Sequence, residues 1–208
     1  MRYIYYFLLL MLSSCTQYYD REYPHQLYAD NVLNNFVLEQ QGADTNIEVY
    51  STGGGIHEHI ERMSVGFIYN KVMSIEELRV LFVKYNEWFR YRVNTQLKEY
   101  LKSYPAPIHE FQIEVAVMNP MGKTVPHGLP CFAAIVQGFI NYCTHDLDPE
   151  LKKYDTLYVE PYEDALEIVR NEHPEVLPPE YLLPAEEFRA IASSKNRDPK
   201  VLMIPTKR

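Results

Sequence analysis

The chain has 208 residues, a formal net charge of −8 and a hydrophobic content of 47%. This length suits one domain with a tail, or at most two small domains, and the apolar content excludes a wholly disordered chain. No basic cluster or stripe is present, which argues against nucleic acid as a partner. The acidic balance also provides no electrostatic attraction to an anionic lipid surface.

A short apolar run occupies the first residues. Arg2 precedes apolar residues from Tyr3 to Leu12, and the run closes on Leu12-Ser13-Ser14-Cys15. A membrane span needs about 20 apolar residues, so this run is too short to cross a bilayer but has the length of an export-signal core. The alternatives are an ordinary signal peptide and a signal anchor in which Cys15 is a chance cysteine.

The closing four residues resemble the lipobox of bacterial lipoproteins, in which an aliphatic residue and two small residues precede the cysteine that becomes the new N-terminus. The resemblance implies that residues 1–14 are removed and that Cys15 carries thioether-linked diacylglycerol. No cofactor is expected besides this covalent lipid. Thr16 follows the cysteine, and the absence of Asp there implies, by the enterobacterial sorting rule, release to the outer membrane. We therefore expect a cell-envelope protein that faces the periplasm or the cell surface.

Residues 15–44 are interpreted as the lipidated N-terminus and a tether. Tyrosines are interleaved with polar residues and no periodicity persists, so disorder is the default expectation. Within this stretch, the apolar spacing of Asn31–Leu38 is compatible with one or two helical turns against the domain.

A globular domain is predicted over residues 45–173. Ile47 and Val49 alternate with polar residues and predict a short strand that ends in Gly53-Gly54-Gly55. The alternation in Met63–Tyr69 predicts a second strand.

The longest predicted element is a helix that begins with a capping box at Ser74 and Glu77. Apolar residues then recur at steps of three and four as far as Leu101, with a break or bend expected around Asn94. Pro105 cannot continue the helix. We expect this helix to pack on the core rather than lie on a membrane surface.

Strands dominate the next part of the chain. Phe111–Val117 alternates and predicts a strand with one exposed face, which carries Gln112 and Glu114. Residues 119–130 form a loop rich in proline and glycine. The stretch from Cys131 to Cys143 has β character, and Gly138 interrupts it with a bulge or a turn.

The C-terminal part begins with a strand marked by Leu157 and Val159, followed by a helix from Glu163 to about Asn171. Residues 174–208 are a proline-rich arm. The order of elements predicts an α+β fold: a mainly antiparallel sheet of about 4–5 strands, with one long amphipathic helix and a shorter C-terminal helix packed on one face.

Candidate chemical sites are few. His57, His59 and Glu61 would point the same way in an extended chain and are weak candidates for a zinc or copper site, but a solvated loop is the favoured interpretation and no metal is expected. Cys131 and Cys143 form a possible disulfide in an oxidising compartment if the chain reverses near Gly138. The alternative is two buried free thiols.

No catalytic residues are predicted, because the sequence lacks phosphate-loop and serine-nucleophile motifs. The expected role is non-catalytic binding or scaffolding of an envelope protein. The expected surface is the exposed sheet face with Gln112 and Glu114, together with the loops around Gly53–Gly55 and Pro120–Pro130. The alternatives are an envelope enzyme, such as a metal-dependent hydrolase that uses His57 and His59, and a surface-exposed adhesin or host-contact lipoprotein.

Overall fold

The computed structural model describes residues 24–146 and 154–178. The lipobox with Cys15 and nearly all of the predicted C-terminal arm lie outside these residues. The expected fold class is confirmed: the chain forms an α+β fold in which three helices pack against one mostly antiparallel sheet. The sheet has six strands, more than the sequence predicted.

The strands are β1 (Ile47–Ile56), β2 (Ile60–Tyr69), β3 (Phe111–Val117), β4 (Phe132–Val136), β5 (Phe139–His145) and β6 (Tyr154–Pro161). The helices are α2 (Pro24–Ala43), α3 (Ile75–Gln96) and α4 (Tyr162–Glu172). Two short 3₁₀ turns are η1 (Lys98–Tyr100) and η3 (Pro174–Val176).

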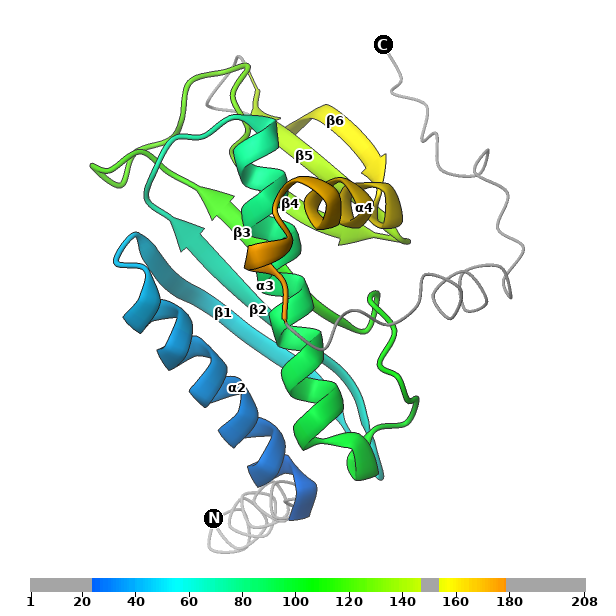
Figure 1. Ribbon diagram of the computed structural model, residues 1–208. Helices are drawn as coiled ribbons and strands as arrows, with labels where there is room; N and C mark the ends of the chain where they lie inside the picture. Colours follow the sequence, from blue (N-terminus) through cyan, green and yellow to red (C-terminus); the bar gives the residue numbers. More distant parts are fainter. Residues whose placement is uncertain (1–23, 147–153, 179–208) are drawn as a thin grey trace, which may run out of the picture. The chain divides into compact units, whose positions relative to one another are not determined.

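The strands lie in the sheet in the order in which they occur along the chain. Every neighbouring pair is antiparallel except β2 and β3, which run parallel. A parallel pair requires a crossover connection, and α3 supplies it. All three helices lie on one face of the sheet, with α3 at the centre (Figure 1).

Helix α2 corrects the prediction of a disordered tether for residues 24–43, which form a helix of 20 residues, while residues 15–23 of that prediction lie outside the described ranges. The spacing of its buried residues follows the helical period, and they pack into the core: Ala29, Val32, Leu33 and Phe36. The ring of Phe36 lies 5.2 Å from that of Phe89 in α3 and 6.3 Å from that of Phe67 in β2, centroid to centroid. The helical turns expected at Asn31–Leu38 are confirmed as part of this longer helix.

Helix α3 begins as predicted, because both hydrogen bonds of the Ser74–Glu77 capping box are present. It ends at Gln96, before the predicted Leu101, and the chain continues as η1.

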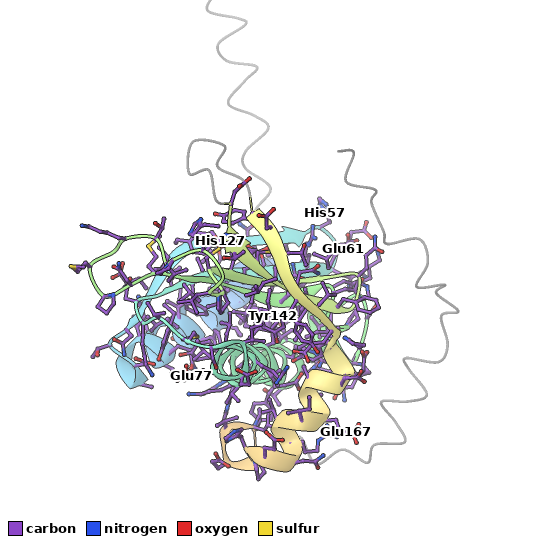
Figure 2. All side chains as sticks on the ribbon, turned by 90° about the horizontal axis from the view of Figure 1, so that it is seen from above. His57, Glu61, Glu77, His127, Tyr142 and Glu167 are labelled. Carbon is purple, nitrogen blue, oxygen red and sulfur yellow. The ribbon has the colours of Figure 1, made fainter. Side chains whose placement is uncertain are left out.

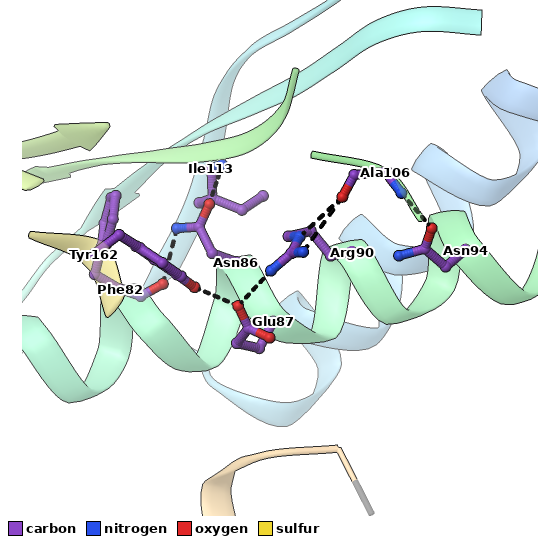
Figure 3. Close-up of polar contacts among 8 residues, drawn as sticks. All are labelled: Phe82, Asn86, Glu87, Arg90, Asn94, Ala106, Ile113 and Tyr162. Atoms are coloured by element: carbon purple, nitrogen blue, oxygen red, sulfur yellow. Dashed lines mark hydrogen bonds and ion pairs between the residues drawn. The ribbon is translucent and has the colours of Figure 1, made fainter. Parts of the chain in front are cut away.

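Polar side chains of α3 form hydrogen bonds with backbone groups of α3 itself and of neighbouring segments. Asn86 donates to the Phe82 carbonyl at 2.9 Å and accepts the Ile113 amide at 2.8 Å (Figure 3). Strand β4 pairs with β3 only at Val115 and Ala116, so Asn86 satisfies a strand amide beyond that pairing.

A second polar cluster joins α3 to α4. The Oε1 atom of Glu87 accepts from Arg90 Nη1 at 3.0 Å and from the Tyr162 hydroxyl at 2.6 Å (Figure 3). Arg90 also donates to the Ala106 carbonyl, and the Ala106 amide donates to Asn94. The side chain of Glu87 is fully buried. This charge is therefore compensated by Arg90 inside the core.

The chain reverses between β4 and β5 at the predicted position. Gln137 and Gly138 have φ angles of 54° and 88°, and two consecutive positive values are typical of the type I′ hairpin turn. The segment after α4 is held by Trp88 of α3, whose indole Nε1 donates to the Val176 carbonyl at 2.9 Å. Residues 174–177 thus pack with the domain, whose compact unit ends at Leu177.

Candidate binding surface on the sheet

The face of the sheet opposite α2, α3 and α4 is not covered by any helix among residues 24–146 and 154–178. We call it the uncovered sheet face. Strand alternation and register assign its residues: in β2, β3 and β4 they lie between the core residues, and partners across the strands share the face. Its centre is formed by Ser64, Gly66, Gln112, Glu114, Ala116 and Ala134.

The predicted location of Gln112 and Glu114 on one face of β3 agrees with this register, but the face is less exposed at these two residues than expected. Gln112 is only 9% exposed, and Glu114 is half-buried. Tyr50 of the edge strand β1 accounts for part of this burial. Its hydroxyl reaches across β2 and donates to Oε2 of Glu114 at 3.2 Å.

Gly66 leaves room for the Tyr50 ring because it has no side chain. A Cβ atom at Gly66 would lie 2.5 Å from Cζ of Tyr50 and closer still to Oγ of Ser51. The tyrosine ring therefore covers the glycine of the neighbouring strand. Burial, and then the charge of Glu114, raise the pKa of Tyr50 to about 12, so its hydroxyl is a neutral hydrogen-bond donor at physiological pH.

A second tyrosine leans inward from the opposite edge of the sheet. The ring of Tyr154 in β6 stacks on Phe132 in β4 at 6.0 Å and contacts His145 in β5 at 5.5 Å, centroid to centroid. Like Tyr50, Tyr154 crosses one strand to reach the next. Two edge tyrosines thus flank a centre made of small and polar side chains.

This face carries much of the exposed apolar surface of the domain. Ten large apolar side chains are exposed in the part of the chain that the structure describes, and four lie here: Tyr50, Val136, Tyr154 and Val159. Aromatic side chains are enriched in protein–protein interfaces because they bury a large area with few rotatable bonds. The uncovered sheet face is therefore the candidate binding surface.

A shallow pocket of about 510 Å³ lies at one end of this face. It is lined by Thr45, Asn46, Glu48, Ile68, Asn70, Met118, Pro120 and Gly122. Two of these residues belong to the predicted loop Pro120–Pro130, so that loop does border the surface. Gly53–Gly55 does not form a loop, because it lies within β1 and pairs with Arg62–Ser64 near the other end of the strand. The two predicted segments are therefore far apart.

His57 and His59 lie in the tight turn between β1 and β2, where the His57 amide donates to the His59 carbonyl at 3.0 Å. Figure 2 shows His57 and Glu61 near each other at the surface. Glu61 accepts from Nζ of Lys102 at 2.9 Å, and this hydrogen bond and charge lower its pKa. Within residues 24–146 and 154–178, no three His, Cys, Asp or Glu side chains are grouped to hold a metal ion.

Cys131 and Cys143 are free thiols in the structure. The chain reverses between them as a disulfide requires, but Cys143 pairs with Phe132, so Cys131 is one residue out of register. Burial raises the pKa of Cys131 to about 12. Cys131 is buried and Cys143 is partly buried.

No helix in the described ranges has the length and apolar character that a membrane crossing requires. Comparison of the chain with family models, with curated proteins and with solved structures gives no match. The site is therefore argued from its own geometry.

Replacing Gly66 by alanine is expected to displace the Tyr50 ring and to lower the free energy of unfolding by about 1–3 kcal/mol, measured by urea denaturation. Gly42→Ala is the control, because a Cβ atom there meets nothing within 4 Å. Because Gly42 lies in helix α2, alanine there is expected to leave the free energy of unfolding unchanged or to raise it by up to about 1 kcal/mol. Equal effects of the two substitutions would contradict the packing of Tyr50 on Gly66.

Proposed function

We propose that this protein is a lipid-anchored cell-envelope protein that binds another envelope protein through the uncovered sheet face. The observation that carries the binding part is the pair of edge tyrosines, Tyr50 and Tyr154, which lean over a sheet face that no described helix covers. The sequence Leu12-Ser13-Ser14-Cys15 supports the lipid anchor.

The chemistry of the face favours a protein segment that presents apolar side chains. Exposed rings and aliphatic groups provide the apolar contact, whose burial contributes about 25 cal/mol per Å². Near the centre, the half-buried Glu114 carboxylate, which accepts from the Tyr50 hydroxyl, provides a hydrogen-bond acceptor that orients a partner. Val159, on the edge strand β6, extends the apolar area to the border of the sheet.

The anchor is tested by replacing Cys15 with serine and labelling growing cells with radioactive palmitate. The expected result is label in the wild-type protein and none in Cys15→Ser, which is no longer processed to a lipidated mature form. Mass analysis of the mature N-terminus checks the same point without a label. Equal labelling of the two proteins, or an unmodified leader in the mature wild type, would contradict the anchor.

Binding is tested by isolating the full-length protein from solubilised envelopes and comparing the proteins that accompany it. Tyr50→Ala together with Tyr154→Ala is expected to remove a partner that the wild type retains. Tyr158→Ala is the matched control, because Tyr158 is exposed on the same edge strand but pairs with Tyr142 of the core. A partner that is retained by the double variant would contradict binding through this face.

A further inference from the structure

The distance between the proposed anchor and the folded domain is short. Eight residues, Thr16 to Tyr23, separate Cys15 from the first residue of α2. Even fully extended, nine Cα–Cα steps span only about 30 Å. If Cys15 is held in a membrane, the end of the domain at which α2 begins must therefore lie close to that membrane.

That end of the domain brings together three segments that are far apart in sequence. The ring of Tyr28 in α2 stacks on Tyr100 of η1 at 5.4 Å, centroid to centroid. Leu101, next to η1, bridges to Ile60 at the start of β2. The start of α2, the turn η1 and the β1–β2 hairpin tip thus form one surface (Figure 1).

This surface carries a group of exposed large apolar side chains that is separate from the group on the uncovered sheet face. Leu27 is 67% exposed, Tyr28 53% and Tyr104 55%. The Nζ atom of Lys98 lies 4.7 Å from the centroid of the Tyr104 ring. Tyrosine combines an apolar ring with a polar hydroxyl, and it is enriched where membrane meets water. Lysine can extend its apolar stem along such a layer while its charge stays in water.

The charges at this end are mixed rather than basic. Lys102 is paired with Glu61, and Glu99 lies beside Lys98 in η1. Together with the net charge of −8, this composition favours contact through aromatic and aliphatic side chains and not attraction to anionic lipid headgroups.

We infer that Leu27, Tyr28 and Tyr104 form a membrane-contacting surface that rests on the lipid bilayer holding Cys15. The inference rests on the proposed lipid anchor. It fixes the orientation of the domain: the β1–β2 hairpin tip faces the lipid, and the pocket at Pro120 and Gly122, at the other end of these strands, faces away. The uncovered sheet face is then accessible to a partner from the side.

The test uses the full-length lipidated protein in vesicles of phosphatidylcholine and phosphatidylethanolamine that contain a phospholipid with a photoactivatable diazirine near its headgroup. After irradiation, labelled peptides are identified by mass spectrometry. The expected result is several-fold more label in the peptides that contain Leu27, Tyr28 and Tyr104 than in the peptide with Met121, which is 75% exposed at the other end. Adding salt or anionic lipid is expected to leave this ratio unchanged.

The double variant Tyr28→Ser and Tyr104→Ser is expected to lose most of the label at these positions while keeping the lipid on Cys15. Its urea denaturation midpoint controls for folding, because both rings are more than half exposed in the wild type. Equal labelling of the Leu27 and Met121 peptides in a protein whose N-terminus carries lipid would overturn the membrane contact alone. A mature N-terminus without lipid would instead overturn the proposed anchor.

Discussion

Replacing Phe36 by alanine is expected to lower the free energy of unfolding by about 3–5 kcal/mol. Phe36 is 1% exposed, and its ring joins α2 to the core by contacting Phe67 and Phe89. The substitution removes a buried ring at a junction of helix and sheet, and a cavity is expected between the buried rings of Phe67 and Phe89. Urea denaturation of the full chain measures the change.

Leu38→Ala in the same helix is the control for this experiment. Leu38 is 66% exposed, so its loss is expected to change the free energy of unfolding by less than about 0.5 kcal/mol. If Phe36→Ala and Leu38→Ala behaved alike, α2 would contribute little to folding, and the prediction of a tether through residue 44 would regain its support.

Replacing Arg90 by alanine is expected to cost about 3–5 kcal/mol of unfolding free energy, because it leaves the carboxylate of Glu87 buried without its ion-pair partner. The Tyr162 hydroxyl alone does not balance this charge. A double variant, Glu87→Gln with Arg90→Met, removes both charges and is expected to recover much of the loss, since a neutral pair has no buried charge to compensate.

Lys71→Ala is the control for the Arg90 experiment. The ion pair of Lys71 with Glu77 is exposed at both ends, and such pairs contribute about 0–1 kcal/mol. Thermal or urea unfolding at neutral pH compares the variants. If Arg90→Ala lowered the free energy of unfolding no more than Lys71→Ala does, that result would contradict a buried ion pair between Glu87 and Arg90.

The sequence predicted elements whose signals are local. Alternation identified β2 and β3, and the capping box at Ser74 identified the start of α3. The turn at Gly138 was predicted as one of two alternatives, a bulge or a turn. These features depend on neighbours within a few residues, so one sequence contains the information.

Helix α2 was missed because polar and aromatic residues surround its narrow apolar stripe. Ala29, Val32, Leu33 and Phe36 follow the helical spacing, but the prediction recognised only the last part of it. The parallel pairing of β2 with β3 was also missed. The strand–helix–strand order of this segment is compatible with such a crossover, but the short connections elsewhere favoured hairpins.

The candidate surface was predicted in part. The alternation of β3 placed Gln112 and Glu114 on one face, and the register confirms that placement. The edge tyrosines were missed because their positions depend on the pairing of distant strands. Tyr50 reaches Glu114 only because Gly66 lies between them on β2, and sequence alone does not give that register.

The two exposed apolar groups have different expected partners. The uncovered sheet face, with Tyr50 and Tyr154 at its edges, is proposed to bind protein. The group of Leu27, Tyr28 and Tyr104 is inferred to contact lipid. Because they lie on different parts of the domain, variants of one group are expected to leave the other activity unchanged, which allows the two proposals to be tested in the same protein.

Site-specific photocrosslinking in intact cells compares two adjacent positions of β6. Val159 pairs with Asn141 on the uncovered sheet face, and Tyr158 pairs with Tyr142 of the core, yet both side chains are 43% exposed. With p-benzoylphenylalanine at each position in turn, we expect a discrete crosslinked protein from position 159 and none from position 158. The same product from both positions, or from position 158 alone, would contradict binding through the uncovered sheet face.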